Sequence, residues 1–161
     1  VYCHATGFKI LMDCKAGRAS KALETLKKIM PDSEKNPSAR SGAEPYVFTN
    51  CYSTHPGYYG KSYQSWTTGT SVWCMMGVYE GIMGVKRDYE GLRVDPCFPA
   101  EWEEAEVTRH FRGADYHIVV HNPGHLENGR GTVRVDGKIC PDSVLPDFRD
   151  GKRHEVEVLL G

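Results

Sequence analysis

The sequence has 161 residues, of which 40% are hydrophobic, and a formal net charge of −1 from 20 basic and 21 acidic side chains. This length suffices for one compact domain with its own core, or for two small units that share an interface. Because the charges balance, no field over the whole chain favours nucleic acid or a membrane surface, and no apolar run approaches the roughly 20 residues of a membrane span.

The chain begins with Val1-Tyr2-Cys3-His4 rather than with Met, and it lacks the basic and apolar regions of a signal peptide. We therefore interpret it as a piece of a longer protein or as a mature product. Its six cysteines form no CxxC pair, and Cys14 and Cys74 lie within apolar helical patterns, so we expect reduced thiols and a cytoplasmic location. Neither the cysteines nor the seven histidines show the spacing of zinc ligands, and we expect no metal.

Two helices are expected before residue 31. From Arg18 to Met30 apolar residues recur at helical spacing opposite a charged face. Ser20 is the expected N-cap of this helix, and Pro31 is expected to end it. An earlier helix is expected over about 7–16, and Gly17 separates the two, so they should form a helical hairpin.

Residues 31–65 contain four prolines among polar residues and tyrosines. A long irregular segment in a compact domain is typical of a functional loop. Aromatic rings in such a segment either stack on the apolar faces of sugars or anchor the loop, and the sequence leaves both readings open. The aromatic residues are Tyr46, Phe48, Tyr52, Tyr58, Tyr59, Tyr63 and Trp66.

The segment from Thr68 to Met83 is predicted to be a helix that is apolar almost all round, with Glu80 as its only charge. A helix of this kind is usually surrounded by protein. After Gly84 the hydrophobic period becomes two, with turn signals between the runs, which predicts an antiparallel sheet or sandwich. The alternating runs lie at 92–94, 107–111, 116–120, 133–135 and 156–158.

The clearest local signal for chemistry is Trp66-Thr67-Thr68-Gly69-Thr70, which opens the apolar helix. The first turn of a helix has unpaired amide groups and a partly positive end, so hydroxyls and a glycine there suit an oxyanion or phosphate. Alternatively, Thr67 or Thr68 merely caps the helix. His4 precedes the first helix as a lone histidine, and Glu44 is the one carboxylate in the loop segment that could serve as an acid or as a polar group.

An ordered set of short segments resembles the inverting glycoside phosphorylases of the cellobiose, cellodextrin, chitobiose and laminaribiose type. Any single segment is a weak signal, but the set occurs in the family's order and covers nearly the whole chain. The segments are Val1–His4, Ile29–Pro31, Glu44–Phe48, Ser65–Trp73, Ile82–Val85, Tyr89–Pro99 and Phe111–Ala114.

The resemblance implies an α+β piece of a longer glycosyltransferase. Members have an (α/α)6 barrel followed by an antiparallel β-sandwich, so residues 1–85 would be the C-terminal part of the catalytic barrel with active-site loops, and residues 86–161 the sandwich. Members reversibly cleave a β-linked disaccharide or oligosaccharide with inorganic phosphate, giving an α-sugar 1-phosphate with inversion and needing no cofactor. The implied partners are a β-linked gluco-oligosaccharide or related disaccharide, phosphate, the rest of the barrel and a second copy in a homodimer, without nucleic acid or membrane.

The resemblance also implies roles for individual residues. The family's phosphate site uses a histidine at the position of His4 and a Thr-Gly pair at Thr68 and Gly69. An imidazolium beside helix-start amides suits a doubly charged nucleophile. The catalytic aspartic acid and a phosphate-binding arginine lie upstream in the family, so this chain should contain no catalytic residue and should be inactive alone. The candidate sugar-binding residues are Glu44, Tyr46 and Asn50, the last near a position where many members have glutamine.

Two other classes of function are kept as alternatives. A non-catalytic carbohydrate-binding or structural β-sandwich would explain the aromatic residues and the alternating strands, but it gives no reason for the helix start at Thr68-Gly69. A phosphorylase-like domain of a glucan synthase, or a related hydrolase, would share the architecture. A hydrolase needs a base carboxylate to activate water, whereas phosphate is itself the nucleophile of a phosphorylase.

Overall fold

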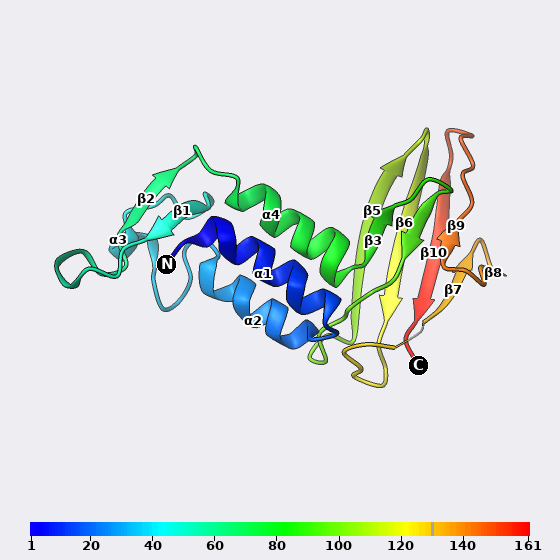
Figure 1. The fold of residues 1–161 in the computed structure, drawn as a ribbon. Helices are drawn as coiled ribbons and strands as arrows, with labels where there is room; N and C mark the ends of the chain where they lie inside the picture. Colours follow the sequence, from blue (N-terminus) through cyan, green and yellow to red (C-terminus); the bar gives the residue numbers. More distant parts are fainter. Residues whose placement is uncertain (130) are drawn as a thin grey trace.

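The computed structural model describes residues 1–129 and 131–161. It is elongated: three helices lie side by side, with a β-hairpin at one end and the remaining strands at the other (Figure 1). The helical elements are α1 (Cys3–Lys15), α2 (Ala19–Ile29), α3 (Ser38–Ser41), the 3₁₀ turn η1 (Pro56–Tyr58), α4 (Thr70–Met76) and the π-helical segment η2 (Gly77–Ile82). The strands are β1 (Thr49–Tyr52), β2 (Ser62–Ser65), β3 (Val85–Arg87), β4 (Leu92–Val94), β5 (Glu104–Phe111), β6 (Ala114–His121), β7 (Thr132–Val135), β8 (Lys138–Ile139), β9 (Val144–Leu145) and β10 (Arg153–Leu159).

Helices α1 and α2 form the helical hairpin that the sequence predicts, with Gly17 in the turn between them. The amphipathic stripe of α2 faces inward, as its spacing requires. The prediction of Ser20 as N-cap is wrong, because Arg18 occupies that position and Ser20 lies inside the first turn. Helix α1 begins at Cys3 rather than near residue 7, so His4 belongs to its first turn instead of preceding it.

The turn between α1 and α2 is held by Asp13, whose side chain is only 2% exposed. Its carboxylate pairs with Lys9 on the same helix and lies 2.8 Å from the Arg18 guanidinium. Lys9 also donates to the Thr25 hydroxyl of α2 at 3.0 Å. A buried carboxylate is tolerated because its partners supply the hydrogen bonds that water would otherwise give.

Helix α4 passes without a break into the π-helical segment η2, and together they fill most of the predicted helix over 68–83. Gly7 of α1 permits a close approach to α4, since a Cβ there would lie 2.5 Å from Trp73 Cβ. The prediction that this helix is surrounded by protein is wrong for the described chain: Val72 is 56% and Met75 57% exposed. The physical reason is that α1 covers one side of α4 and no other described helix covers the opposite side (Figure 1).

The segment 31–65 is less irregular than the sequence predicts. It contains the short helix α3 and the antiparallel hairpin β1–β2, which pairs Thr49 with Ser65 and Cys51 with Tyr63. The start of the chain attaches to this hairpin, because Tyr2 forms a β-bridge with Cys51. The hairpin therefore lies beside the first turn of α1.

The second half of the chain forms two sheets that contribute to one hydrophobic core. The larger sheet has the strand order β5-β6-β10-β7-β8, and the smaller has the order β3-β4-β9. Alternate residues of β6 and β10 point into the core, as the period of two predicts. Buried side chains include Tyr116, Ile118, Val120, Val156 and Val158.

The expectation of a purely antiparallel arrangement is wrong. Strands β6 and β10 pair in parallel, from Arg153 opposite Asp115 to Leu159 opposite His121, so the five-stranded sheet is mixed. A parallel pair needs a long crossover connection, and the 31 residues from 122 to 152 supply it while forming β7, β8 and β9 on the way. Periodicity within a strand carries no information about the direction of its neighbour.

All six cysteines are free thiols. No helix in the described part of the chain has both the length and the apolar character needed to cross a membrane.

Candidate functional site

The candidate site lies at the hairpin end of the helices, where the first turns of α1 and α4 meet. His4 lies in the first turn of α1, and Gly69 is the N-cap residue of α4. A Cβ on Gly69 would lie 2.9 Å from His4 Cε1 and 3.2 Å from His4 Nε2. The imidazole is therefore pressed against the backbone of Gly69, a contact that only glycine permits without displacing the ring.

Thr68 directly precedes Gly69 and holds the start of α4 with its side chain. Its Oγ1 accepts a hydrogen bond from the Thr70 backbone amide at 3.1 Å and lies 2.8 Å from the Thr70 hydroxyl. The next amides, of Ser71 and Val72, have no acceptor within the helix, as in any first helical turn. This helix start, with its partial positive charge, thus lies next to the His4 ring.

Asn50 of β1 connects the helix start to the hairpin. Its Oδ1 accepts a hydrogen bond from Thr68 Oγ1 at 3.1 Å, and its Nδ2 donates to Gln64 Oε1 at 2.9 Å. Gln64 belongs to β2 and lies opposite Asn50 in the register that pairs Thr49 with Ser65 and Cys51 with Tyr63. The backbone of Gln64 has a φ of 55°, which is uncommon for a residue with a side chain.

Glu44 and Tyr46 both contact Trp66, the first residue of the segment 66–70 that leads into α4. Trp66 Nε1 donates to Glu44 Oε1 at 2.9 Å, and the Tyr46 and Trp66 rings meet edge to face with centroids 6.3 Å apart. The hydrogen bond from Trp66 lowers the pKa of the Glu44 carboxyl from its ordinary value. A carboxylate with a lowered pKa is ionised at neutral pH and is a poor proton donor, which argues against Glu44 as a general acid.

The structure thus brings the six predicted site residues together in neighbouring pairs: His4 with Gly69, Thr68 with Asn50, and Glu44 with Tyr46 through the Trp66 ring. Tyr46 is the outermost, with 74% of its surface exposed. The sequence reasoning missed Gln64 and the φ of 70° at Trp66. A hairpin register would have placed Gln64 opposite Asn50, but residues 49–65 show no clean alternation from which to derive one.

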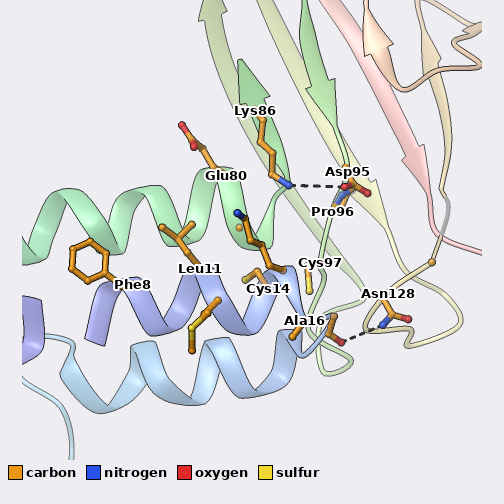
Figure 2. A pocket seen from close by; sticks show the side chains of 15 residues that line it. Phe8, Leu11, Cys14, Ala16, Glu80, Lys86, Asp95, Pro96, Cys97 and Asn128 are labelled. Atoms are coloured by element: carbon orange, nitrogen blue, oxygen red, sulfur yellow. Dashed lines mark hydrogen bonds and ion pairs between the residues drawn. The ribbon is translucent and has the colours of Figure 1, made fainter. Parts of the chain in front are cut away.

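A separate cavity of about 980 Å³ lies at the other end of the helices, where α1 and η2 meet the strands (Figure 2). Its lining includes Leu11, Lys86, Asp95, Cys97 and Asn128, and none of the six predicted site residues. Lys86 Nζ stands 3.9 Å from Asp95 Oδ2, and Asn128 Nδ2 donates to the Gly17 carbonyl at 3.3 Å. The contact between Asn128 and Gly17 joins the helical half to the sheet half.

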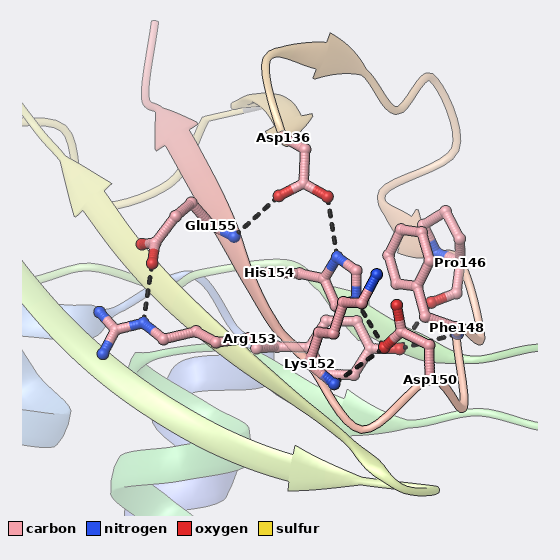
Figure 3. A network of polar contacts seen from close by, with 9 residues as sticks. Asp136, Pro146, Phe148, Asp150, Lys152, Arg153, His154 and Glu155 are labelled. Atoms are coloured by element: carbon pink, nitrogen blue, oxygen red, sulfur yellow. Dashed lines mark hydrogen bonds and ion pairs between the residues drawn. The ribbon is translucent and has the colours of Figure 1, made fainter.

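A polar network also stands at the turns that flank β10 (Figure 3). His154 is 7% exposed, with Nδ1 2.8 Å from Asp136 Oδ2 and Nε2 3.1 Å from Asp150 Oδ1. Its ring stacks on Phe148 with centroids 3.6 Å apart. The bond to Asp136 is the main cause that raises the pKa of His154. Both polar partners of this ring come from the sheet half, so the network fastens the turns around β10.

Comparison with known proteins identifies the family of the chain. Residues 1–84 match the profile described as Glycosyl hydrolase 94 superfamily, catalytic domain. The chain is 41% identical over 159 residues to solabiose phosphorylase of Paenibacillus borealis, covering 98% of this chain and 21% of that protein. It is 37% identical over 163 residues to the 3-O-beta-D-glucopyranosyl-beta-D-glucuronide phosphorylase of the same organism, covering 99% of this chain and 21% of the relative.

A third relative is the N,N'-diacetylchitobiose phosphorylase of Vibrio proteolyticus, 32% identical over 162 residues, with 100% of this chain and 20% of that protein covered. The chain therefore spans about a fifth of the length of the curated relatives it matches. The family profile covers the helices, the hairpin and every residue of the candidate site. The chain belongs to the glycosyl hydrolase 94 superfamily.

Proposed function

We propose that this chain is the C-terminal part of an inverting phosphorylase that cleaves a β-linked disaccharide or oligosaccharide with inorganic phosphate. One observation carries the proposal: the His4 ring lies against Gly69, the N-cap residue of α4, and the Thr68 hydroxyl bonds the Thr70 amide at the same helix start. These groups offer hydrogen-bond donors and partial positive charge to one small region, which is what a phosphate dianion requires. The three relatives described above are phosphorylases by name.

In this proposal His4, Thr68 and Gly69 hold phosphate for attack on the anomeric carbon, from the face opposite the leaving sugar. Holding the nucleophile in line converts an encounter in solution into a reaction within the site. The departing oxygen needs a proton from an acid. Glu44 is unsuited to that role because its pKa is lowered, so the catalytic aspartic acid is assigned to the part of the enzyme outside this chain.

Glu44, Tyr46 and Asn50 are proposed to face the sugar. The exposed Tyr46 and Trp66 rings provide flat apolar surfaces of the kind that stack on sugar faces. Glu44 and Asn50 place a carboxylate and an amide beside these rings, and such groups hydrogen-bond hydroxyls. The sugar itself is one β-linked disaccharide or a close relative, acted on with phosphate and without a cofactor.

The proposed architecture assigns residues 1–85 to the end of an (α/α)6 barrel and residues 86–161 to a C-terminal β-sandwich. The exposed apolar face of α1 and α4 supports the first assignment, since the other barrel helices would cover it. The two sheets around one core support the second. The six free thiols suit a reducing compartment, and we place the enzyme in the cytoplasm, as a homodimer.

The test uses the full-length enzyme and a panel of β-linked disaccharides that includes those named for the relatives. Phosphorus NMR is expected to show an α-sugar 1-phosphate that forms only when phosphate is present. Thr68→Val and His4→Ala should each raise the KM for phosphate about tenfold or more, the effect of losing one hydrogen bond to a charged group. Thr67→Val is the matched control, because this neighbouring hydroxyl is exposed and precedes the helix start.

Two results would contradict the proposal. Release of free sugar at a rate independent of phosphate would identify a hydrolase. An unchanged KM for phosphate in both Thr68→Val and His4→Ala would remove these residues from the phosphate site.

A further inference from the structure

We propose that Cys14 and Cys97 form a redox-active thiol pair, which a small disulfide such as glutathione disulfide converts to an intramolecular disulfide bond. The pair lies at the junction between the helical half and the sheet half of the chain. Neither cysteine belongs to the candidate phosphate site, so the inference does not depend on the proposed function.

The segment η2 brings the two cysteines together from distant parts of the chain. Cys14 lies near the end of α1, and its Sγ packs on Gly81, where an added Cβ would lie 2.9 Å from the sulfur. The backbone amide of Cys97 donates to the carbonyl of Ile82 at 3.1 Å. Because Gly81 and Ile82 are adjacent in η2, the two thiols lie next to each other on the same cavity wall (Figure 2).

The cavity of about 980 Å³ gives a reagent room to approach this pair. Its volume lies within the range of small-molecule sites, which suits a reagent the size of glutathione. Cys14 is partly exposed, and Cys97 is 7% exposed. The charged lining residues are Lys15, Glu80, Lys86 and Asp95. Since two cations balance two carboxylates, the cavity does not repel an anionic disulfide as an acidic pocket would.

The two thiols differ in their readiness to react. The Cys14 thiol hydrogen-bonds to the Cys97 sulfur and thereby lowers the pKa of Cys97, because a hydrogen bond to a thiolate stabilises the charged form. The same contact raises the pKa of Cys14, so Cys14 keeps its proton. The thiolate is the nucleophile in thiol–disulfide exchange. Cys97 is therefore the attacking residue, and Cys14 is the resolving one.

The exchange consists of two steps. In the first, the Cys97 thiolate attacks one sulfur of glutathione disulfide, the S–S bond of the reagent breaks, and one glutathione leaves as a thiolate. In the second, Cys14 gives its proton to solvent and attacks the Cys97 sulfur of the mixed disulfide, which releases the second glutathione. The cysteine pair loses two electrons, and glutathione disulfide is reduced to two thiols.

The new bond would fasten the end of α1 to the segment that follows β4. The side-chain contacts that already join the two halves include the ion pair of Lys27 with Glu101 at 2.6 Å. A disulfide between positions far apart in the chain restricts the unfolded state and so favours the folded one. The oxidised enzyme should therefore unfold at a higher temperature than the reduced enzyme.

The test starts from the reduced full-length enzyme, which is treated with glutathione disulfide and then with iodoacetamide to block the remaining thiols. Peptide mapping by mass spectrometry without reduction identifies the linked residues. We expect the peptide that contains Cys14 to be joined to the one that contains Cys97, and dithiothreitol should separate them. Absence of this link, or a link from either cysteine to a different residue, would overturn the inference. This measurement needs no variant, so it does not depend on how a substitution affects folding.

Two serine variants test the roles of the two thiols. In Cys14→Ser the resolving thiol is missing, so glutathione should remain attached to Cys97. In Cys97→Ser the attacking thiol is missing, so Cys14 should stay free. The reverse pattern would overturn the assignment of Cys97 as the attacking residue. Cys140→Ser changes another free thiol of the sheet half and is the matched control, which should still form the link.

Thermal unfolding then tests the effect of the bond. Oxidation should raise the midpoint of the unmodified enzyme and of Cys140→Ser, and it should leave the midpoint of Cys97→Ser unchanged. An equal rise in all three would mean that the bond does not fasten the junction. Phosphorolysis is not a readout in any of these experiments, so a failure of the proposed function would be seen separately.

Discussion

The two halves of the molecule differ in how completely they bury their apolar residues. In the sheet half Ile118, Val120 and Val158 are fully buried between two sheets. In the helical half Met12 is 60% and Val72 56% exposed, on the sides of α1 and α4 that no described helix covers. The sheet half therefore has a finished core of its own. The helical half has the beginning of a core that the proposed barrel would complete.

The largest expected effect tests the finished core. Ile118→Ala should lower the free energy of unfolding by about 3–4 kcal/mol, because it removes buried methyl groups and leaves a cavity. Met12→Ala, a truncation of similar size on the exposed face of α1, should change it by no more than about 0.5 kcal/mol. Urea unfolding of the 161-residue chain, followed by circular dichroism, measures both. Equal losses for the two variants would remove the contrast between the halves.

A substitution of Asp13 tests the turn between α1 and α2, where the helical half buries a polar side chain within this chain. Asp13→Ala should cost about 2 kcal/mol of stability, since the buried carboxylate links Lys9 and Arg18 across the turn between α1 and α2. The cost stays below that of a wholly buried ion pair, because both cations are partly exposed and regain water. Glu24→Ala is the control, as its ion pairs with Lys21 and Lys28 lie on the exposed face of α2. A loss for Glu24→Ala as large as that for Asp13→Ala would count against this role.

His154 makes the sheet half sensitive to pH. Its folded pKa is raised by the bond to Asp136, then by Asp150, so its contribution is full below the unfolded value of about 6.5 and is lost as pH rises through the folded pKa. The pKa values of Asp136 and Asp150 are lowered by their bonds. Their contributions are present above about 3.9 and are lost as pH falls through the folded values.

The unmodified chain should accordingly lose stability as the pH rises above about 6.5, the unfolded value of histidine, and His154→Gln should flatten that slope. Chemical unfolding at a series of pH values measures the slope. His55→Gln changes an exposed histidine of the hairpin turn and should leave the slope as it is. If both variants keep the slope, it arises elsewhere in the chain.

The smallest effect on stability is expected at the exposed helix face. Val72→Ser together with Met75→Ser should change the free energy of unfolding of the 161-residue chain by no more than about 0.5 kcal/mol. The same pair should reduce self-association of the chain, because it removes apolar surface from water. Sedimentation velocity measures the association. In the full-length enzyme the pair should instead be destabilising, and a neutral effect there would contradict the proposal that other barrel helices cover this face.

The sequence is enough to predict the helices and strands that bury one face. It is not enough to predict features that depend on contacts between residues far apart in the chain. The helical stripe of residues 18–30 and the alternation in 116–120 and 156–158 predict α2, β6 and β10, because hydrophobic burial imposes the period. The same patterns do not show whether neighbouring strands run parallel or antiparallel, so the parallel pairing of β6 with β10 could not be predicted. The exposed face of α4 has a related explanation: apolarity shows that a surface needs cover without showing which chain segment provides it.

Within the candidate site, the Thr68-Gly69 motif stood out because a helix start has its own local signature. No residue pattern connects this motif to His4, some 65 residues away in the chain. The family resemblance assigns His4 to the same site, and the structure places its ring against Gly69. The roles of His4, Thr68 and Gly69 in binding phosphate remain predictions. The hydrogen bonds from Thr68 to Asn50 and from Asn50 to Gln64 depend on the register of the hairpin, which cannot be derived from the residue pattern. Such contacts arise from the fold as a whole.

Trp66 also gives the molecule an optical reporter. Its indole is 66% exposed and bonded to the ionised Glu44, while Trp73 packs on Phe8 and Trp102 on Phe98. The three fluorophores therefore differ in their environments, and only Trp66 lies between the hairpin and α4. A ligand that displaces Glu44 or covers this indole would change the emission of Trp66, so occupancy of the site can be followed by light without any label.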